Sequence, residues 1–304
     1  MRCASLALAV CLVAAAAASS AAADDTSLLR PLTAQADEPW VLCADPCGYE
    51  RCAAPTLTQA PRQRWHVTVA AYLWAPDLSG TSWANGEPTD IDIAFDDIFD
   101  KLESAFMGYA EVQYDRWSFA VDASYVSLEQ SGTSPNLQVP IVAELEQTII
   151  DLRLGYTVLC REVGSSQWGC CCYPRHLTVD AVIGARNWCL DQELTFTPPT
   201  TGAPVSMSDS ETWWDPYVGA RFRWQFAKRW GLAVYGDVGG FGIEDASELT
   251  WQVQVLLRFH ITRGLFVGLG YRALDVDRVE GTGATRTGID ATYHGPMLGL
   301  GYRF

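Results

Sequence analysis

Met297-Leu-Gly-Leu-Gly-Tyr-Arg-Phe304 closes the chain, and its side chains alternate between two kinds. Successive side chains of a β-strand point to opposite faces, so even and odd positions meet different surroundings. The even face is apolar, with Leu298, Leu300, Tyr302 and Phe304. The odd face is mostly small or charged, with Met297, Gly299, Gly301 and Arg303. The stretch therefore predicts a β-strand that separates an apolar from a polar environment.

The same alternation recurs from Trp65 onward, interrupted by turn residues. A tilted membrane strand needs about 9–11 residues, and each alternating stretch reaches that length. We count about ten stretches, at residues 65–75, 105–114, 117–128, 144–159, 177–190, 212–226, 230–241, 247–261, 264–275 and 291–304.

The links between these stretches alternate in length. The short ones are residues 115–116, 227–229 and 262–263, and the long ones are 76–104, 129–143, 191–211 and 276–290. Links 161–176 and 242–246 break the rule. Short turns at one end and long loops at the other are typical of outer-membrane barrels. We therefore predict an all-β, antiparallel, up-and-down transmembrane β-barrel over residues 65–304, of about ten strands, with eight as the alternative.

Charged residues fall on one face of strand after strand. In residues 247–261, Val253 and Val255 share the apolar face, while Gln254 and Arg258 lie on the other. Charges inside a soluble core are costly unless paired, whereas an apolar face turned to lipid leaves them in the lumen. The predicted lumen charges are Glu111, Asp122, Asp151, Arg153, Asp180, Arg186, Asp215, Arg221, Arg223, Asp237, Arg258, Arg272 and Arg303.

Tryptophans gather near the predicted strand ends. Those at the short-turn ends include Trp65, Trp117 and Trp230. Those at the opposite ends are Trp74, Trp188, Trp213, Trp214 and Trp251. Amphipathic rings favour both membrane interfaces, so this placement predicts two aromatic girdles. The alternative is that strand propensity alone scatters them.

The N-terminal residues carry the pattern of an export signal. Arg2 precedes an apolar run at residues 6–18 that is too short to span a bilayer, and Ala21-Ala22-Ala23 fits a cleavage site. We expect residues 1–23 to be a signal peptide and residues 24–64, which lack periodicity, to be an irregular periplasmic segment. The formal net charge of −15 makes nucleic acid a poor partner.

Eight cysteines follow the predicted signal. They are Cys43, Cys47, Cys52, Cys160, Cys170, Cys171, Cys172 and Cys189. An even number in an oxidising compartment favours disulfides. Their spacing fits no zinc pattern well, so metal binding is the less favoured alternative. The sequence leaves the pairing open.

Several glycine- and aromatic-rich strands resemble those of small outer-membrane β-barrel proteins of the opacity-like type. They are Asp215-Pro-Tyr-Val-Gly-Ala-Arg221, Tyr235-Gly-Asp-Val-Gly-Gly-Phe241, Gly268-Leu-Gly-Tyr-Arg272 and Gly299-Leu-Gly-Tyr-Arg-Phe304. The resemblance covers residues 65–304. It implies the bacterial outer membrane, contact with lipid and lipopolysaccharide, and recognition of terminal Phe304 by the barrel-assembly machinery. The implied functions range from adhesion to small-solute passage.

Carboxylates crowd the first long loop. Weak candidates for a Ca²⁺ site are Asp90, Asp92, Asp96, Asp97 and Asp100. Their spacing is not that of an EF-hand, and a solvated acidic loop without a cofactor is the simpler interpretation. Residues 90–93 alternate like a strand, while Phe95, Ile98 and Phe99 fit one face of a short helix. Such a helix is a candidate constriction in the barrel mouth.

The sequence leaves several functions open. The lumen charges suit a salt-bridged structural core or a narrow diffusion channel. The long loops suit a surface adhesion or binding protein. A rim-site outer-membrane hydrolase is the least favoured reading, because His294 beside Asp290 and Asp275 is its main support. We therefore expect an envelope barrel without enzymatic activity.

Overall fold

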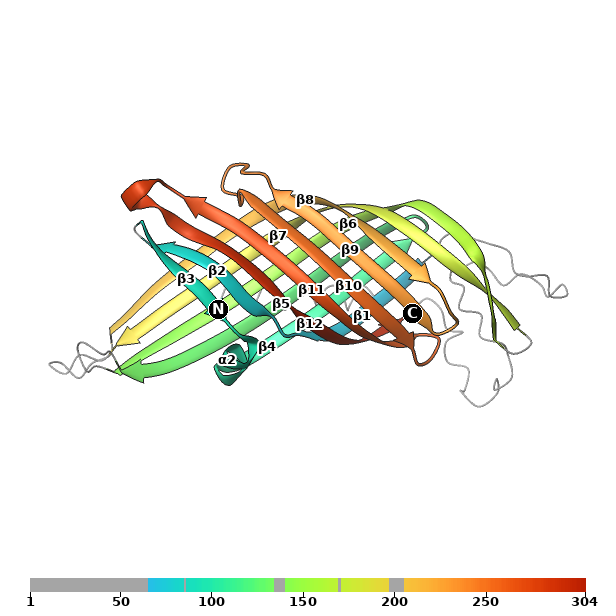
Figure 1. The fold of residues 1–304 in the computed structure, drawn as a ribbon, viewed down its shortest axis with the longest axis horizontal. Helices are drawn as coiled ribbons and strands as arrows, with labels where there is room; N and C mark the ends of the chain where they lie inside the picture. Colours follow the sequence, from blue (N-terminus) through green and yellow to red (C-terminus); the bar gives the residue numbers. More distant parts are fainter. Residues whose placement is uncertain (1–64, 85, 134–139, 169–170, 197–204) are drawn as a thin grey trace.

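Ten strands close into an antiparallel barrel in a computed structural model of the chain, which describes residues 65–84, 86–133, 140–168, 171–196 and 205–304. The wall runs β1, then β4 through β12, and β12 pairs back with β1 (Figure 1). Its strands are β1 (Trp65–Trp74), β4 (Leu102–Tyr114), β5 (Trp117–Thr133), β6 (Pro140–Trp168), β7 (Cys171–Phe196), β8 (Val205–Gln225), β9 (Trp230–Gly240), β10 (Leu249–His260), β11 (Leu265–Glu280) and β12 (Thr287–Arg303). The predicted ten-stranded barrel is confirmed, and the eight-stranded alternative is wrong.

The first long link contains a hairpin and a helix. Strands β2 (Asp77–Ala84) and β3 (Glu87–Ile93) pair with each other, and β2 also pairs with residues 288–294 of β12. Helix α2 (Phe95–Asp100) follows, and the 3-10 turn η2 (Gly283–Thr285) lies between β11 and β12. The predicted strand at residues 90–93 and the predicted short helix after it are therefore both present, one following the other along the chain. All residues of α2 are exposed or half-buried, and a constriction in the barrel mouth stays a prediction.

The apolar face of the wall points outward. Leu269, Leu298 and Leu300 are each more than half exposed, although large aliphatic side chains favour burial. Inward neighbours such as Arg186 and Arg272 are almost fully buried. A continuous apolar belt on the outside suits hydrocarbon, because lipid tails remove it from water. No helix among the described residues is long and apolar enough to cross a membrane.

One aromatic girdle surrounds the end of the barrel with the short turns, here called the short-turn end. Ring pairs with at least one exposed member occur there at Trp65–Tyr114, Trp117–Tyr156 and Tyr302–Phe304, with centroids 4.5–4.8 Å apart. Toward the other end, Trp214 and Tyr271 are about half exposed. Trp74, Trp188 and Trp213 are instead buried inside the barrel, so their assignment to a girdle is wrong. They occupy inward positions of their strands, which proximity to a strand end does not reveal.

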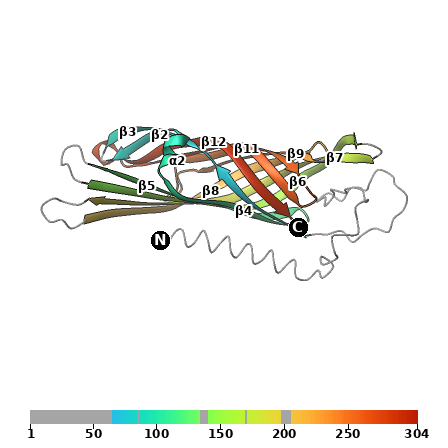
Figure 2. The ribbon, with the colours of Figure 1, turned by 90° about the horizontal axis from the view of Figure 1, so that it is seen from below.

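Strands β5 to β8 continue far beyond the rest of the wall. The predicted loops 129–143 and 191–211 are largely strand, and β7 runs eight residues past Trp188, roughly 26 Å. We call residues 128–133, 140–147, 190–196 and 205–211 the β5–β8 extension. Figure 2 shows it on one side, apart from the β2–β3 hairpin on the other. At the short-turn end, the predicted link 161–176 is mostly an extension of β6 and β7.

The cysteine prediction is only partly covered by the structure. Cys43, Cys47, Cys52 and Cys170 lie outside the described residues, as do the predicted signal peptide and segment 24–64. Cys171 and Cys172 begin β7. Cys160 lies opposite Thr178, eleven residues or roughly 36 Å along β7 from Cys189. A disulfide spans less than about 7 Å between Cα atoms, so Cys160 and Cys189 do not pair with each other.

Candidate functional site in the barrel lumen

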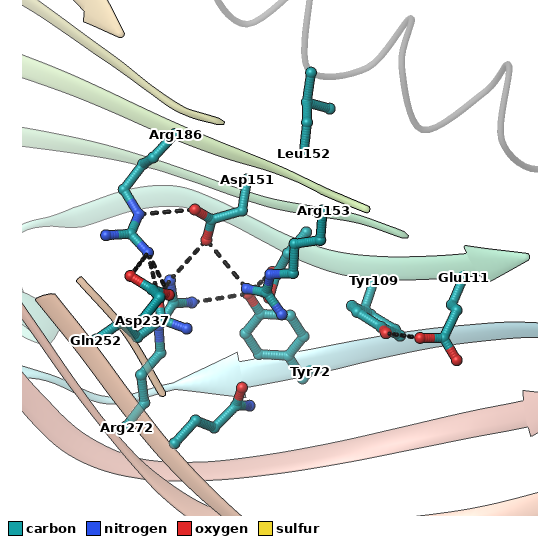
Figure 3. A network of polar contacts seen from close by, with 12 residues as sticks. Tyr72, Tyr109, Glu111, Asp151, Leu152, Arg153, Arg186, Asp237, Gln252 and Arg272 are labelled. Atoms are coloured by element: carbon teal, nitrogen blue, oxygen red, sulfur yellow. Dashed lines mark hydrogen bonds and ion pairs between the residues drawn. The ribbon is translucent and has the colours of Figure 1, made fainter. Parts of the chain in front are cut away.

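A buried guanidinium ties strands together across the middle of the lumen. Arg186 of β7 has no exposed side-chain surface, and its Nε donates to Asp151 Oδ1 of β6 at 2.7 Å. Its Nη2 donates to both carboxylate oxygens of Asp237 on β9 at 3.1 Å, and its Nη1 donates to Thr250 Oγ1 on β10 at 3.0 Å. Figure 3 shows the side chains of Arg186, Asp151 and Asp237 converging on one another.

Two further arginines complete this central layer. Arg272 of β11 donates from Nη2 to Gln252 Oε1 at 2.8 Å and to Asp151 Oδ2 at 3.4 Å. Arg153 of β6 donates to Asp122 Oδ2 at 3.0 Å and to Asp151 at 3.2 Å (Figure 3). Asp151 thus accepts from three guanidinium groups. Such multiple pairing is what compensates the desolvation of a buried carboxylate.

A second charged layer lies toward the short-turn end. Arg221 of β8 donates from Nε to Asp180 Oδ2 at 2.8 Å and makes a short contact with Glu111 of β4. Arg223 pairs with the same Asp180 at 3.0 Å. Tyr109 donates to Glu111 at 2.9 Å. These contacts join β4 to β7 and β8 across the barrel, so the interior is cross-linked at two levels.

An apolar cluster fills the lumen on the other side of the central layer. Trp188 and Trp213 stack with centroids 5.7 Å apart and an interplanar angle of 10°. Asp215 accepts from Trp188 Nε1 at 2.8 Å and from the Ser247 backbone N–H at 2.7 Å, which satisfies the polar edge of the cluster. The cluster also includes Trp74, Met107, Ile149, Leu274, Val276, Ala291, Tyr293 and Met297. The sequence contains a signal for this cluster: Trp188 and Trp213 each lie two residues from an inward-facing charged residue, Arg186 and Asp215, and therefore on the same inward face of their strands.

All thirteen predicted lumen charges are buried or half-buried on inward positions of the wall strands. Asp122, Asp151, Arg153, Arg186, Asp237 and Arg272 form the central layer, and Glu111, Asp180, Arg221 and Arg223 the second. Asp215 caps the aromatic stack, while Arg258 and Arg303 lie nearer the short-turn end. Sequence reasoning missed Tyr72, Tyr109, Thr250 and Gln252, whose inward parity was readable but whose partners on distant strands were not.

A cavity of about 250 Å³ opens between the central layer and the short-turn end. Its inner limit is formed by Tyr72, Asp122 and Arg153, and its outer part by His260, Arg258 and Arg303. Toward the opposite end, the central layer and the apolar cluster occupy the lumen. Among the described residues, the central layer and the apolar cluster therefore lie between this chamber and the opposite end of the barrel.

The predicted rim sites do not assemble. Asp90 and Asp92 lie on β3, and Asp96, Asp97 and Asp100 lie on α2. Among the described residues, no three His, Cys, Asp or Glu side chains are arranged to hold a metal ion. His294 faces outward on β12, and its Nδ1 is 3.0 Å from the hydroxyl of Tyr271. Asp275 accepts from Thr292, and Asp290 lies opposite Asp277. Within the described part of the chain, no hydrogen bond or ion pair joins His294 to either Asp275 or Asp290.

The chain has a distant likeness to several solved structures. No protein-family model and no curated protein matches the chain. The outer membrane protease OmpT of Escherichia coli is 11% identical, with 82% of this chain and 99% of that chain covered and a TM-score of 0.45. Neisserial surface protein A is 11% identical over 80% and 98% of the two chains, with a TM-score of 0.29. The attachment protein Ail of Yersinia pestis is 11% identical over 80% and 99%, with a TM-score of 0.30.

These likenesses are too distant to transfer any residue role, so the class rests on the geometry of the chain itself. A closed antiparallel barrel with an apolar outer belt and a charged interior is an integral outer-membrane β-barrel protein of the bacterial type. Within that class, this chain has ten wall strands, a cross-linked lumen and an extended rim on the β5–β8 side.

Proposed function

We propose that the protein is a structural barrel of the outer membrane that does not conduct ions at rest. The observation that carries this proposal is the central layer, in which Arg186, Arg272 and Asp151 are each at most 1% exposed. A conducting pore keeps its charged groups hydrated along the ion path, whereas these groups bond to one another. We also propose an orientation in which the short turns face the periplasm and the β5–β8 extension faces the outside of the cell.

Planar bilayers test the closed state directly. The purified barrel is expected to show no stepwise conductance in concentrated KCl, because the central layer and the Trp188–Trp213 stack occupy the lumen. A general porin inserted into the same bilayers is the positive control. Reproducible unitary steps from the wild-type protein, at a frequency proportional to the protein added, would show that the lumen is a diffusion channel.

A second candidate function is surface binding through the outer face of the β5–β8 extension. Glu129, Glu144 and Glu193 lie directly opposite one another on β5, β6 and β7 and are all exposed. Like charges in directly opposed positions destabilise a sheet. A positively charged partner bound to the row of three carboxylates would relieve their mutual repulsion. We therefore propose a cationic polypeptide surface as the partner of this row.

The substitution Glu144→Gln tests that proposal, because it removes the central charge of the row. We expect a gain in the free energy of unfolding of about 0.2–1 kcal/mol from relieved repulsion. We also expect weaker binding of polylysine to barrels in neutral-lipid vesicles, measured by cosedimentation. Gln130→Glu, which adds a carboxylate on the other face of β5 and leaves the row intact, is the control and should not weaken polylysine binding. Unchanged polylysine binding by Glu144→Gln would remove this candidate function.

A further inference from the structure

The cavity at the short-turn end has a strong excess of positive charge. Six arginines line it, namely Arg153, Arg221, Arg223, Arg258, Arg263 and Arg303. Two carboxylates, Glu111 and Asp122, line it as well. The inner arginines are neutralised, because Arg153 pairs with Asp122 and Arg221 with Glu111 and Asp180. Arg258 lies in the outer part of the chamber, beyond these neutralised arginines.

Arg258 and His260 on β10 each carry a buried polar atom that has no hydrogen-bond partner among the described residues. Within the part of the chain that the structure describes, Arg258 makes no ion pair, and its Nε is buried without a hydrogen-bond acceptor. Its guanidinium lies 6.0 Å from the ring of Phe266. His260 is only 8% exposed, and its Nδ1 also lacks a hydrogen-bond partner. Both side chains line the cavity. Buried donors without acceptors are costly, so an acceptor supplied by a ligand would be stabilising.

One part of the remaining wall of the chamber is apolar. Ala233, Leu256, Phe266 and Met297 line it from β9, β10, β11 and β12. Leu256 lies two residues from Arg258 on the same inward face, so a molecule bound to the guanidinium also meets an aliphatic surface. The chamber thus combines a cationic group with an apolar patch inside about 250 Å³.

We infer that this chamber binds a small organic anion with a carboxylate group on an apolar body. The planar guanidinium of Arg258 matches a carboxylate in bidentate geometry, and His260 supplies a further polar atom beside it. Leu256 and Phe266 contact the apolar body. The volume suits a compact molecule the size of a single substituted ring rather than a long chain. The inference does not depend on whether the barrel conducts ions.

Benzoate is a suitable probe, measured by isothermal titration calorimetry with the folded full-length barrel in neutral detergent. Arg258→Gln is expected to weaken benzoate binding roughly 10- to 100-fold, because a charge-assisted hydrogen bond is lost. Arg116→Gln, which changes an exposed arginine in a turn at the same end, is expected to leave affinity unchanged. Benzyl alcohol, which has the ring without the charge, should bind the wild-type barrel more weakly than benzoate by a similar factor. Inorganic phosphate, which has charge without a ring, should bind more weakly than benzoate.

Two results would overturn the inference. One is equal benzoate affinity in Arg258→Gln and the wild type, which would place the ligand elsewhere. The other is phosphate binding as tight as benzoate, which would show that the apolar wall takes no part. Folding of each variant is checked by the gel shift on boiling. If Arg258→Gln does not fold, Arg258→Lys decides, since it keeps the charge but loses the bidentate geometry and should bind benzoate several-fold more weakly.

Discussion

Replacing Arg186 by alanine is expected to lower the free energy of unfolding by about 3–5 kcal/mol. The side chain is fully buried and bonds to Asp151, Asp237 and Thr250. Its removal leaves the Asp237 carboxylate, which is ion-paired to Arg186, buried without a compensating cation. An uncompensated buried charge costs more than the pair contributes, so this loss exceeds that of any exposed ion pair.

Urea unfolding in lipid vesicles, followed by tryptophan fluorescence, measures this loss. Arg116→Ala at an exposed turn is the matched control and should change stability by less than about 0.5 kcal/mol. The double variant Arg186→Met with Asp237→Asn should recover part of the loss, because it removes both charges together. A single variant as stable as the wild type would mean that the central layer contributes no net stability and that the lumen is hydrated.

The sequence predicted the wall of the barrel well because lipid enforces a strict alternation there. In β10 and β12 each outward side chain meets hydrocarbon and each inward one meets the lumen, so strand number and sidedness were readable from residues such as Val255 and Arg258. The β5–β8 extension has water on both sides. Its strands therefore lack a compulsory pattern, and backbone pairing between β6 and β7 continues through stretches that read as loops.

The interior was predictable in composition and not in arrangement. Parity places Arg186 and Asp237 on the inside, but it does not say that strands β7 and β9, two positions apart in the wall, bring them together. The apolar cluster was missed for a related reason. Trp188 and Trp213 lie near strand ends, where an interfacial girdle competes as an explanation, and only their inward parity separates the two. Partner choice depends on barrel closure, which residue spacing along one strand does not contain.

Introducing a charge at the centre of the outer belt is expected to destabilise the barrel by about 2–4 kcal/mol. Val255 is the position of choice on β10, because it faces outward, is 40% exposed and lies four residues from both Trp251 and Phe259. Those two aromatic residues lie toward the two ends of the strand. The substitution Val255→Arg therefore places a guanidinium near the middle of the hydrocarbon, where hydration is most costly to lose.

Unfolding in vesicles again provides the measurement, and the position of the charge provides the control. Thr262→Arg, in the exposed turn between β10 and β11, should cost about 0–1 kcal/mol because the charge stays at the interface. The difference between the two variants depends on depth in the bilayer and should shrink in short-chain detergent, where the arginine reaches water more easily. Equal stability of Val255→Arg and Thr262→Arg in vesicles would mean that the apolar face of the wall does not contact lipid tails, because no other environment makes the two arginines equivalent.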